Sequence, residues 1–135
     1  MSTLNGGPGN IVTNGLVLYL DAANYQSYIS GSTTWYDLSG NNNSGSLVNG
    51  PTYSSTNAGS IVFDGVDNYI TTPYVPGTII SQSIGCWINK TNLQSSFILA
   101  TNTIYFGFEI YPTTIYANIT NGDYGYVSYN INGPQ

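Results

Sequence analysis

The chain has 135 residues, of which 41% are hydrophobic and only 5% are charged, and its formal net charge is −5 with a single basic residue. This length and apolar content predict one globular domain with a buried core. Nucleic acid and anionic membrane surfaces are excluded as partners, because both are bound through clusters of lysine and arginine.

The single cysteine, Cys86, and the lack of histidine limit the chemistry of the chain. No intrachain disulfide can form, and a zinc site would lack ligands. Cys86 lies in the apolar run SIGCWI, which predicts that it packs as a small hydrophobic residue.

The first residues of the chain, 1–14, are rich in Gly, Asn, Ser and Thr, and they predict a flexible arm ahead of a domain that covers 15–135. They have neither a basic start nor an apolar centre, so no signal peptide is expected. No apolar run in the chain approaches the ~20 residues that a membrane-spanning helix needs.

Short apolar runs rich in Val, Ile, Thr, Tyr and Phe follow one another along the rest of the chain, and such residues favour strands. No sustained helical period accompanies them. The predicted strands cover residues 15–22, 44–50, 60–65, 68–73, 81–89, 97–101, 104–111, 114–120 and 124–131. Many short strands separated by turn residues indicate an all-β protein, an antiparallel sandwich or barrel.

The stretch WYDLSGNNNSGSLVNG, residues 35–50, joins two aromatic residues and an acid to a run of amides and glycines. Asp37 and Ser39 before Gly40 favour an Asx-type turn, in which side-chain oxygens accept hydrogen bonds from nearby backbone N–H groups. Trp35 and Tyr36 could stack on a sugar or anchor the turn to the core. The turn residues favour the second interpretation, with the loop connecting two sheets.

Two acids in FDGVDNY, Asp64 and Asp67, have the spacing of oxygen ligands in a calcium loop, and Asp21 or Asp37 could join them. Calcium takes six to eight oxygen ligands, some of which backbone or Asn carbonyls could supply. Asp-Gly-x-Asp is also a common hairpin turn, which is the favoured interpretation. No cofactor is therefore expected, although Ca²⁺ is a candidate.

The last third of the chain alternates most clearly between apolar and polar residues, as a strand with one buried face does. Pro112 and Asn121-Gly122-Asp123 mark the predicted hairpin turns between its strands. The predicted outward face is rich in tyrosine and forms the candidate binding surface, which consists of Tyr105, Glu109, Tyr111, Tyr116, Tyr124 and Tyr126, with Asn118 and Asn130 beside them. Such a face suits a protein interface, where tyrosine is enriched and charge depleted. It also suits sugar stacking or simple exposure to water.

Enzymatic activity is not expected. Sugar hydrolysis usually needs two carboxylates that flank the bond, whereas Glu109 is the only glutamate and has no acid two residues away on its face. The sequence also offers no plausible pairing of a nucleophile with a general base.

Three segments in one order carry a resemblance: GLVLYLDAANYQSY, then WYDLSGNNNSGSLVNGPTY, then SIVFDGVDNYI. Together they resemble the laminin-G-like, or concanavalin A-like, lectin/glucanase domains found in phage virion proteins and some bacterial surface proteins. The resemblance covers about residues 15–90, and SIGCWIN matches a further strand of the family. It implies an antiparallel jelly-roll sandwich, here shortened at its C-terminal end or part of a longer polypeptide.

The resemblance and the low charge predict a non-enzymatic structural protein of a virion, in a capsid decoration or a tail fibre. Open sheet edges would be covered by copies of the chain or by other virion proteins. The alternative is a carbohydrate-binding module that recognises glycans of a host or another surface. Fold resemblance specifies function only weakly.

Overall fold

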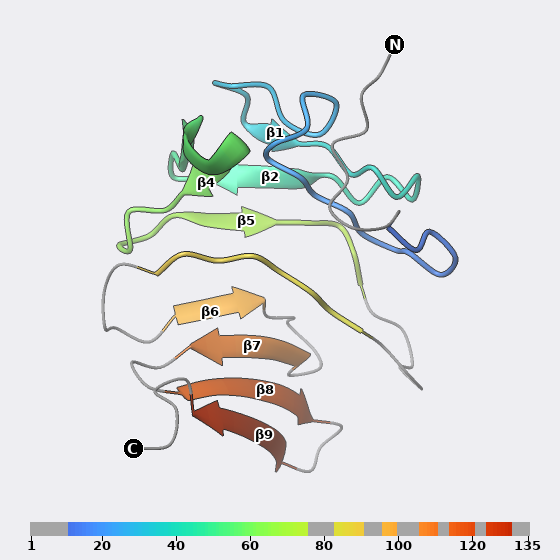
Figure 1. Cartoon of the computed structure of the whole chain (residues 1–135), viewed down its shortest axis with the longest axis vertical. Coiled ribbons are helices and arrows are strands. Elements are labelled where there is room, and N and C mark those ends of the chain that lie inside the picture. Colours follow the sequence, from blue (N-terminus) through green and yellow to red (C-terminus); the bar gives the residue numbers. More distant parts are fainter. Residues whose placement is uncertain are drawn as a thin grey trace. The chain divides into compact units, whose positions relative to one another are not determined.

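The computed structural model describes residues 11–75, 83–90, 96–99, 106–110, 114–120 and 124–130. This part of the chain is dominated by strands in antiparallel pairs, with a single short 3-10 turn and no α-helix among the described residues (Figure 1). The all-β prediction agrees with this architecture. The chain divides into two compact units, Met1–Pro76 and Gly77–Gln135, and the single domain predicted for 15–135 stays a prediction.

The first unit contains a three-stranded antiparallel sheet in the order β1-β2-β5, formed by Thr34–Trp35, Gly45–Val48 and Tyr69–Thr71. Strands β2 and β5 confirm two predictions, whereas the two-residue strand β1 was missed. Trp35 pairs with Gly45, so the loop 36–44 joins two neighbouring strands of one sheet. The prediction that this loop connects two sheets is therefore wrong.

A second, two-stranded sheet pairs β3, Thr52–Ser54, with β4, Ser60–Val62, through the short 3-10 element η1, Thr56–Ala58. The chain reaches this sheet from β2 through Asn49 and Gly50, whose φ angles of 63° and 85° lie in the left-handed region. These conformations end β2 at Val48, although the prediction extended the strand to residue 50. Asn and Gly are the residues that adopt them at least cost.

Two predicted strands are absent among the described residues. Residues 15–22 make no ladder with another strand, and neither do residues 83–89, the described part of the range predicted as 81–89. In the second segment Cys86 and Trp87 are exposed, so the prediction of a packed Cys86 is also wrong. An apolar run specifies a strand only where another strand can satisfy its backbone groups.

The second unit contains a four-stranded antiparallel sheet in the order β6-β7-β8-β9 (Figure 1), formed by Ser96–Leu99, Phe106–Ile110, Thr114–Thr120 and Tyr124–Asn130. All four strands were predicted, and the bounds of β8 match the predicted range. The pairing of β6 with β7 contains a register shift between Phe97 and Leu99. The predicted turn residues Pro112 and Asn121-Gly122-Asp123 lie outside the described residues, but the strands on either side of them pair as hairpins require.

The register of β7, β8 and β9 aligns the apolar positions predicted from alternation. Phe108 lies across from Ala117 and Ala117 across from Val127, while Ile110, Ile115 and Tyr129 form the next row. Residues directly opposite each other in an antiparallel pair lie on the same face. Ile110 is only 4% exposed, which agrees with the predicted core face at this position.

Candidate functional site

The tyrosine-rich face of β7–β9 is the candidate site that the sequence predicted, and the register brings its members together. Glu109 lies across from Tyr116, Asn118 across from Tyr126, and Thr120 across from Tyr124. Directly opposite residues have Cβ atoms about 5 Å apart, so these positions form one continuous patch. Asn130, across from Thr114, extends the same face.

The same register gives the neighbours of Glu109. On its face they are Gly107 along β7, Tyr116 across the pair with β8 and Phe97 across the pair with β6. None of these neighbours is a second carboxylate of the kind that sugar hydrolysis usually needs. The predicted members Tyr105 and Tyr111 lie outside the described residues.

The loop 36–44 is organised around the carboxylate of Asp37. Its Oδ1 accepts hydrogen bonds from the backbone N–H groups of Ser39 and Tyr19, both at 2.9 Å. Its Oδ2 accepts one from the Ser39 hydroxyl at 2.7 Å and one from the backbone N–H of Asn43 at 3.0 Å. The predicted Asx turn is confirmed, and this loop serves the fold.

Other side chains of the loop reach the predicted strand at 15–22. Asn41 Nδ2 donates to the Leu16 carbonyl at 2.9 Å, and Asn43 Nδ2 donates to the Val17 carbonyl at 2.8 Å. Ser39 Oγ lies 3.1 Å from the same Val17 carbonyl, but its single proton goes to the nearer Asp37 carboxylate, at 2.7 Å. Loop side chains thus take the hydrogen-bonding role of a partner strand, which explains why this apolar segment stays irregular.

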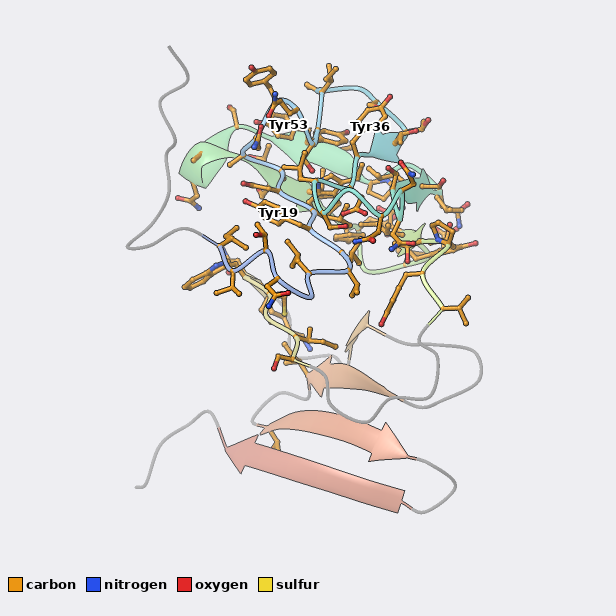
Figure 2. All side chains as sticks on the ribbon, turned by 90° about the vertical axis from the view of Figure 1, so that its right-hand side faces the viewer. Tyr19, Tyr36 and Tyr53 are labelled. Atoms are coloured by element: carbon orange, nitrogen blue, oxygen red, sulfur yellow. The ribbon has the colours of Figure 1, made fainter. Side chains whose placement is uncertain are left out.

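Trp35 and Tyr36, the two aromatic residues at the start of the loop, have different roles. Trp35 packs edge-on against the buried Tyr28, with ring centroids 6.4 Å apart, and its Nε1 is buried without a hydrogen-bond partner in the described part of the chain. Tyr36 is 45% exposed on the surface of its unit (Figure 2). Trp35 therefore anchors the loop, as the structural interpretation predicted.

The electrostatics of Asp37 predict sensitivity to acid. Partial burial alone would raise the pKa of its carboxyl, but hydrogen bonds from Ser39, Tyr19 and Asn43 lower the pKa below its ordinary value. The unfolded chain then binds the proton more tightly, so this stabilisation is complete above the ordinary pKa of about 4 and is lost as pH falls through the folded pKa. The urea midpoint of unfolding should be lower at pH 3 than at pH 6, and this difference should be smaller in Asp37→Asn. An equal drop in both proteins would contradict the assignment.

The calcium candidates Asp64 and Asp67 lie in the turn between β4 and β5. Asp64 Oδ1 accepts the backbone N–H of Val66 at 2.9 Å, and this hydrogen bond lowers the pKa of the carboxyl. The Asn68 side chain accepts from Asp64 N and donates to the Asn49 carbonyl, while Asn49 donates to the Asp67 carbonyl. The Asp64 carboxylate is thus a turn acceptor.

This turn connects strands of different sheets, because β4 pairs with β3 and β5 pairs with β2. The hairpin expected from Asp-Gly-x-Asp is therefore wrong, although the interpretation as a turn is right. Among the residues that the structure describes, no three His, Cys, Asp or Glu side chains lie close enough to hold a metal ion, so Asp21 and Asp37 do not join this turn.

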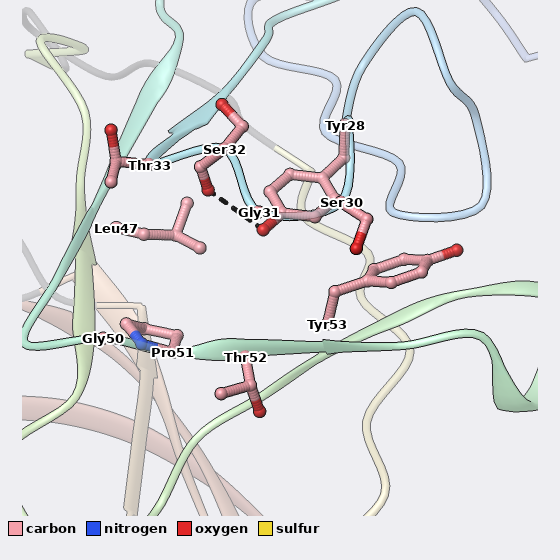
Figure 3. Close-up of a pocket in the computed structure, with 10 residues that line it drawn as sticks. All are labelled: Tyr28, Ser30, Gly31, Ser32, Thr33, Leu47, Gly50, Pro51, Thr52 and Tyr53. Carbon is pink, nitrogen blue, oxygen red and sulfur yellow. Dashed lines mark hydrogen bonds between the residues drawn. The ribbon is translucent and has the colours of Figure 1, made fainter.

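An open pocket of about 390 Å³ in the first unit was missed by sequence reasoning (Figure 3). The rings of Tyr28 and Tyr53, stacked with centroids 5.4 Å apart, form one side, and Leu47 and Pro51 line another part. Hydroxyl residues from 30–33 and Thr52 complete a lining without charged side chains. Its residues come from β2, β3 and a preceding loop. No local sequence motif predicts that these segments meet.

No helix among the described residues is long and apolar enough to cross a membrane. Lys90, the only basic residue, donates to the Ile110 carbonyl at 3.1 Å.

No family model, no curated protein and no solved structure matches this chain. The resemblance to laminin-G-like and concanavalin A-like domains therefore stays a prediction that rests on the motifs.

Proposed function

We propose that this chain is a non-enzymatic structural protein of a virion, in a capsid decoration or a tail fibre, and that it acts through protein–protein contacts. Its fold would be a jelly-roll sandwich of the concanavalin A-like kind. The observation that carries the proposal is the alignment of Glu109, Tyr116, Asn118 and Tyr126 on one face of β7–β9. Tyrosine is enriched and charge depleted at the centre of protein interfaces.

The composition of the chain supports the same proposal. With 13 tyrosines and only seven charged side chains among 135 residues, contacts would depend on aromatic burial and neutral hydrogen bonds. Such contacts lose little strength when salt screens charges. A particle exposed to variable ionic strength would benefit from this property.

The proposal is tested in particles produced from the genome that encodes the chain. Mass spectrometry of purified particles should detect the chain in many copies, and its absence would remove the virion assignment. The double variant Tyr116→Ala/Tyr126→Ala should lower incorporation at least tenfold, since aromatic residues supply much of the energy of an interface. The matched control Tyr25→Ala/Tyr36→Ala removes two exposed tyrosines from the first unit and should incorporate normally.

The second candidate is a carbohydrate-binding module, and the pocket beside Tyr28 and Tyr53 favours it. An uncharged pocket with an apolar side and several hydroxyl groups suits a neutral sugar, and ligand sites commonly combine these features. A glycan array probed with and without Ca²⁺ should then give a specific signal. Loss of that signal in Tyr53→Ala would place the sugar in the pocket, and loss in Tyr116→Ala/Tyr126→Ala would place it on the face. An array without signal overturns this candidate.

A further inference from the structure

The edge strands of the described sheets differ sharply in how well they are protected against pairing with another chain. In the first unit, β1 has two residues and β3, β4 and β5 have three each. In the second unit, β6 has four residues and a register shift against β7. Short edges and bulges are the usual devices that prevent edge-to-edge association.

Strand β9 has none of these protections. It is a seven-residue edge, Tyr124–Asn130, that pairs regularly with β8 along its whole length and has no other partner among the described strands (Figure 1). Its sequence, YGYVSYN, contains no proline and no charged residue, the two kinds of residue that blunt exposed edges. Alternate N–H and C=O groups of β9 therefore face away from β8.

We infer that the β9 edge pairs with the β9 edge of a second copy of this chain, in an antiparallel ladder centred on Val127. This inference deepens the proposed function and rests on it, because it names the partner. A second copy supplies an edge of the same length, equally free of charge, and two-fold dimers are the commonest assemblies of identical chains.

The centre at Val127 follows from the length of β9. With the two-fold axis at this residue, all seven positions of one strand find a partner on the other. Tyr126 would lie across from Ser128 of the second copy, and Gly125 across from its Tyr129. Any other centre leaves residues at both ends unpaired. Aromatic residues across from glycine are a known way to strengthen an edge pairing.

A two-fold axis perpendicular to the sheet also keeps the same face of each copy on the same side. The tyrosine-rich faces of the two copies would then continue into each other, and so would the apolar faces with Phe108 and Val127. The pairing would convert two four-stranded sheets into one sheet of eight strands. No charge repulsion opposes the contact along the ladder, because β9 carries no charge.

The first experiment measures self-association of the full chain by sedimentation equilibrium. Backbone N–H groups alternate in direction along a strand. One of the two variants Val127→Pro and Ser128→Pro therefore removes an N–H that points toward β8, and the other removes an N–H that points away from β8, toward the second copy. Circular dichroism identifies the variant that keeps its fold. In that variant we expect dimerisation to weaken about tenfold or more, because each copy loses a ladder bond. Undiminished dimerisation would overturn the inference.

The second experiment tests the register without disturbing the fold. In a Cys86→Ser background, Val127→Cys places two thiols directly across the two-fold axis, where mild oxidation should join them. Ser128→Cys is the matched control, because its two copies would lie about 8 Å apart, too far for a disulfide. A cross-link at position 128 and none at 127 would overturn the register, and a monomer in both experiments would overturn the pairing.

These outcomes separate the inference from the proposed function. A monomeric chain that still enters particles, and loses that ability in Tyr116→Ala/Tyr126→Ala, contradicts the β9 pairing and leaves the virion assignment in place. A β9-paired dimer absent from particles contradicts the virion assignment alone. Binding of β9 by a strand of a different protein, with no homodimer, also overturns the inference.

Discussion

Replacing Gly59 with alanine is expected to lower the free energy of unfolding by about 3 kcal/mol. A Cβ at this position would lie 2.6 Å from the Ala22 carbonyl oxygen and 2.9 Å from both Ala23 Cα and the Tyr53 hydroxyl. Two of these three neighbours are backbone atoms, which cannot move aside as a side chain can. The φ of 132° adds strain, because residues with a Cβ rarely adopt it.

Gly31→Ala is the matched control for this prediction. Gly31 has a positive φ of 86°, but no atom lies within 4 Å of an added Cβ. Its cost should be about 1 kcal/mol, the strain of a left-handed alanine alone. Urea unfolding of both variants measures the difference. Equal losses of stability in the two variants would contradict this prediction. They would mean that residues 22–23 move aside to accommodate the added Cβ, and that Gly59 does not hold η1 next to them.

The second large effect is expected at Asp37, whose replacement by alanine should destabilise the chain by about 2 kcal/mol. Its carboxylate accepts four hydrogen bonds. Two of them come from residues farther away in the sequence, Tyr19 and Asn43. Bonds to a charged group contribute more than neutral ones, but partial exposure to solvent reduces their sum. Asp37→Asn, which keeps one acceptor oxygen, should lose about half as much.

The control for Asp37 is Asp67→Ala. The Asp67 residue is exposed, and its carboxylate accepts none of the hydrogen bonds found among the described residues, so its loss should change stability by less than about 0.5 kcal/mol. Thermal and urea unfolding of the three variants would rank them. Equal stability of Asp37→Ala and Asp67→Ala would show that the loop does not depend on the carboxylate.

Predictions from the sequence succeeded where alternation and turn residues act locally. The period-two pattern of 114–120 gave the bounds of β8 and the faces of β7–β9, because side-chain alternation is intrinsic to a strand. The Asx turn at Asp37 was predicted for the same reason, since the acceptor and its donor lie two residues apart.

Predictions failed where the outcome depends on distant partners. Residues 15–22 have a strand composition, but the side chains of Asp37, Asn41 and Asn43 satisfy several of their backbone groups. Strand β3 was missed because it has three residues and follows Pro51, and its existence depends on β4. The pocket beside Tyr53 needs residues from segments about 20 positions apart to converge, which no local pattern encodes.

The loop 36–44 lies at the surface, yet its sequence is constrained by hydrogen bonds from its side chains to a distant segment. Asn41 and Asn43 each donate from the side-chain amide to a carbonyl of residues 16–17, more than 20 positions away in sequence. Surface loops usually tolerate insertion and sequence drift, and binding proteins use that freedom to change specificity. Here the hydrogen bonds to Leu16 and Val17 restrict that freedom, so a peptide inserted into this loop should destabilise the segment that contains them.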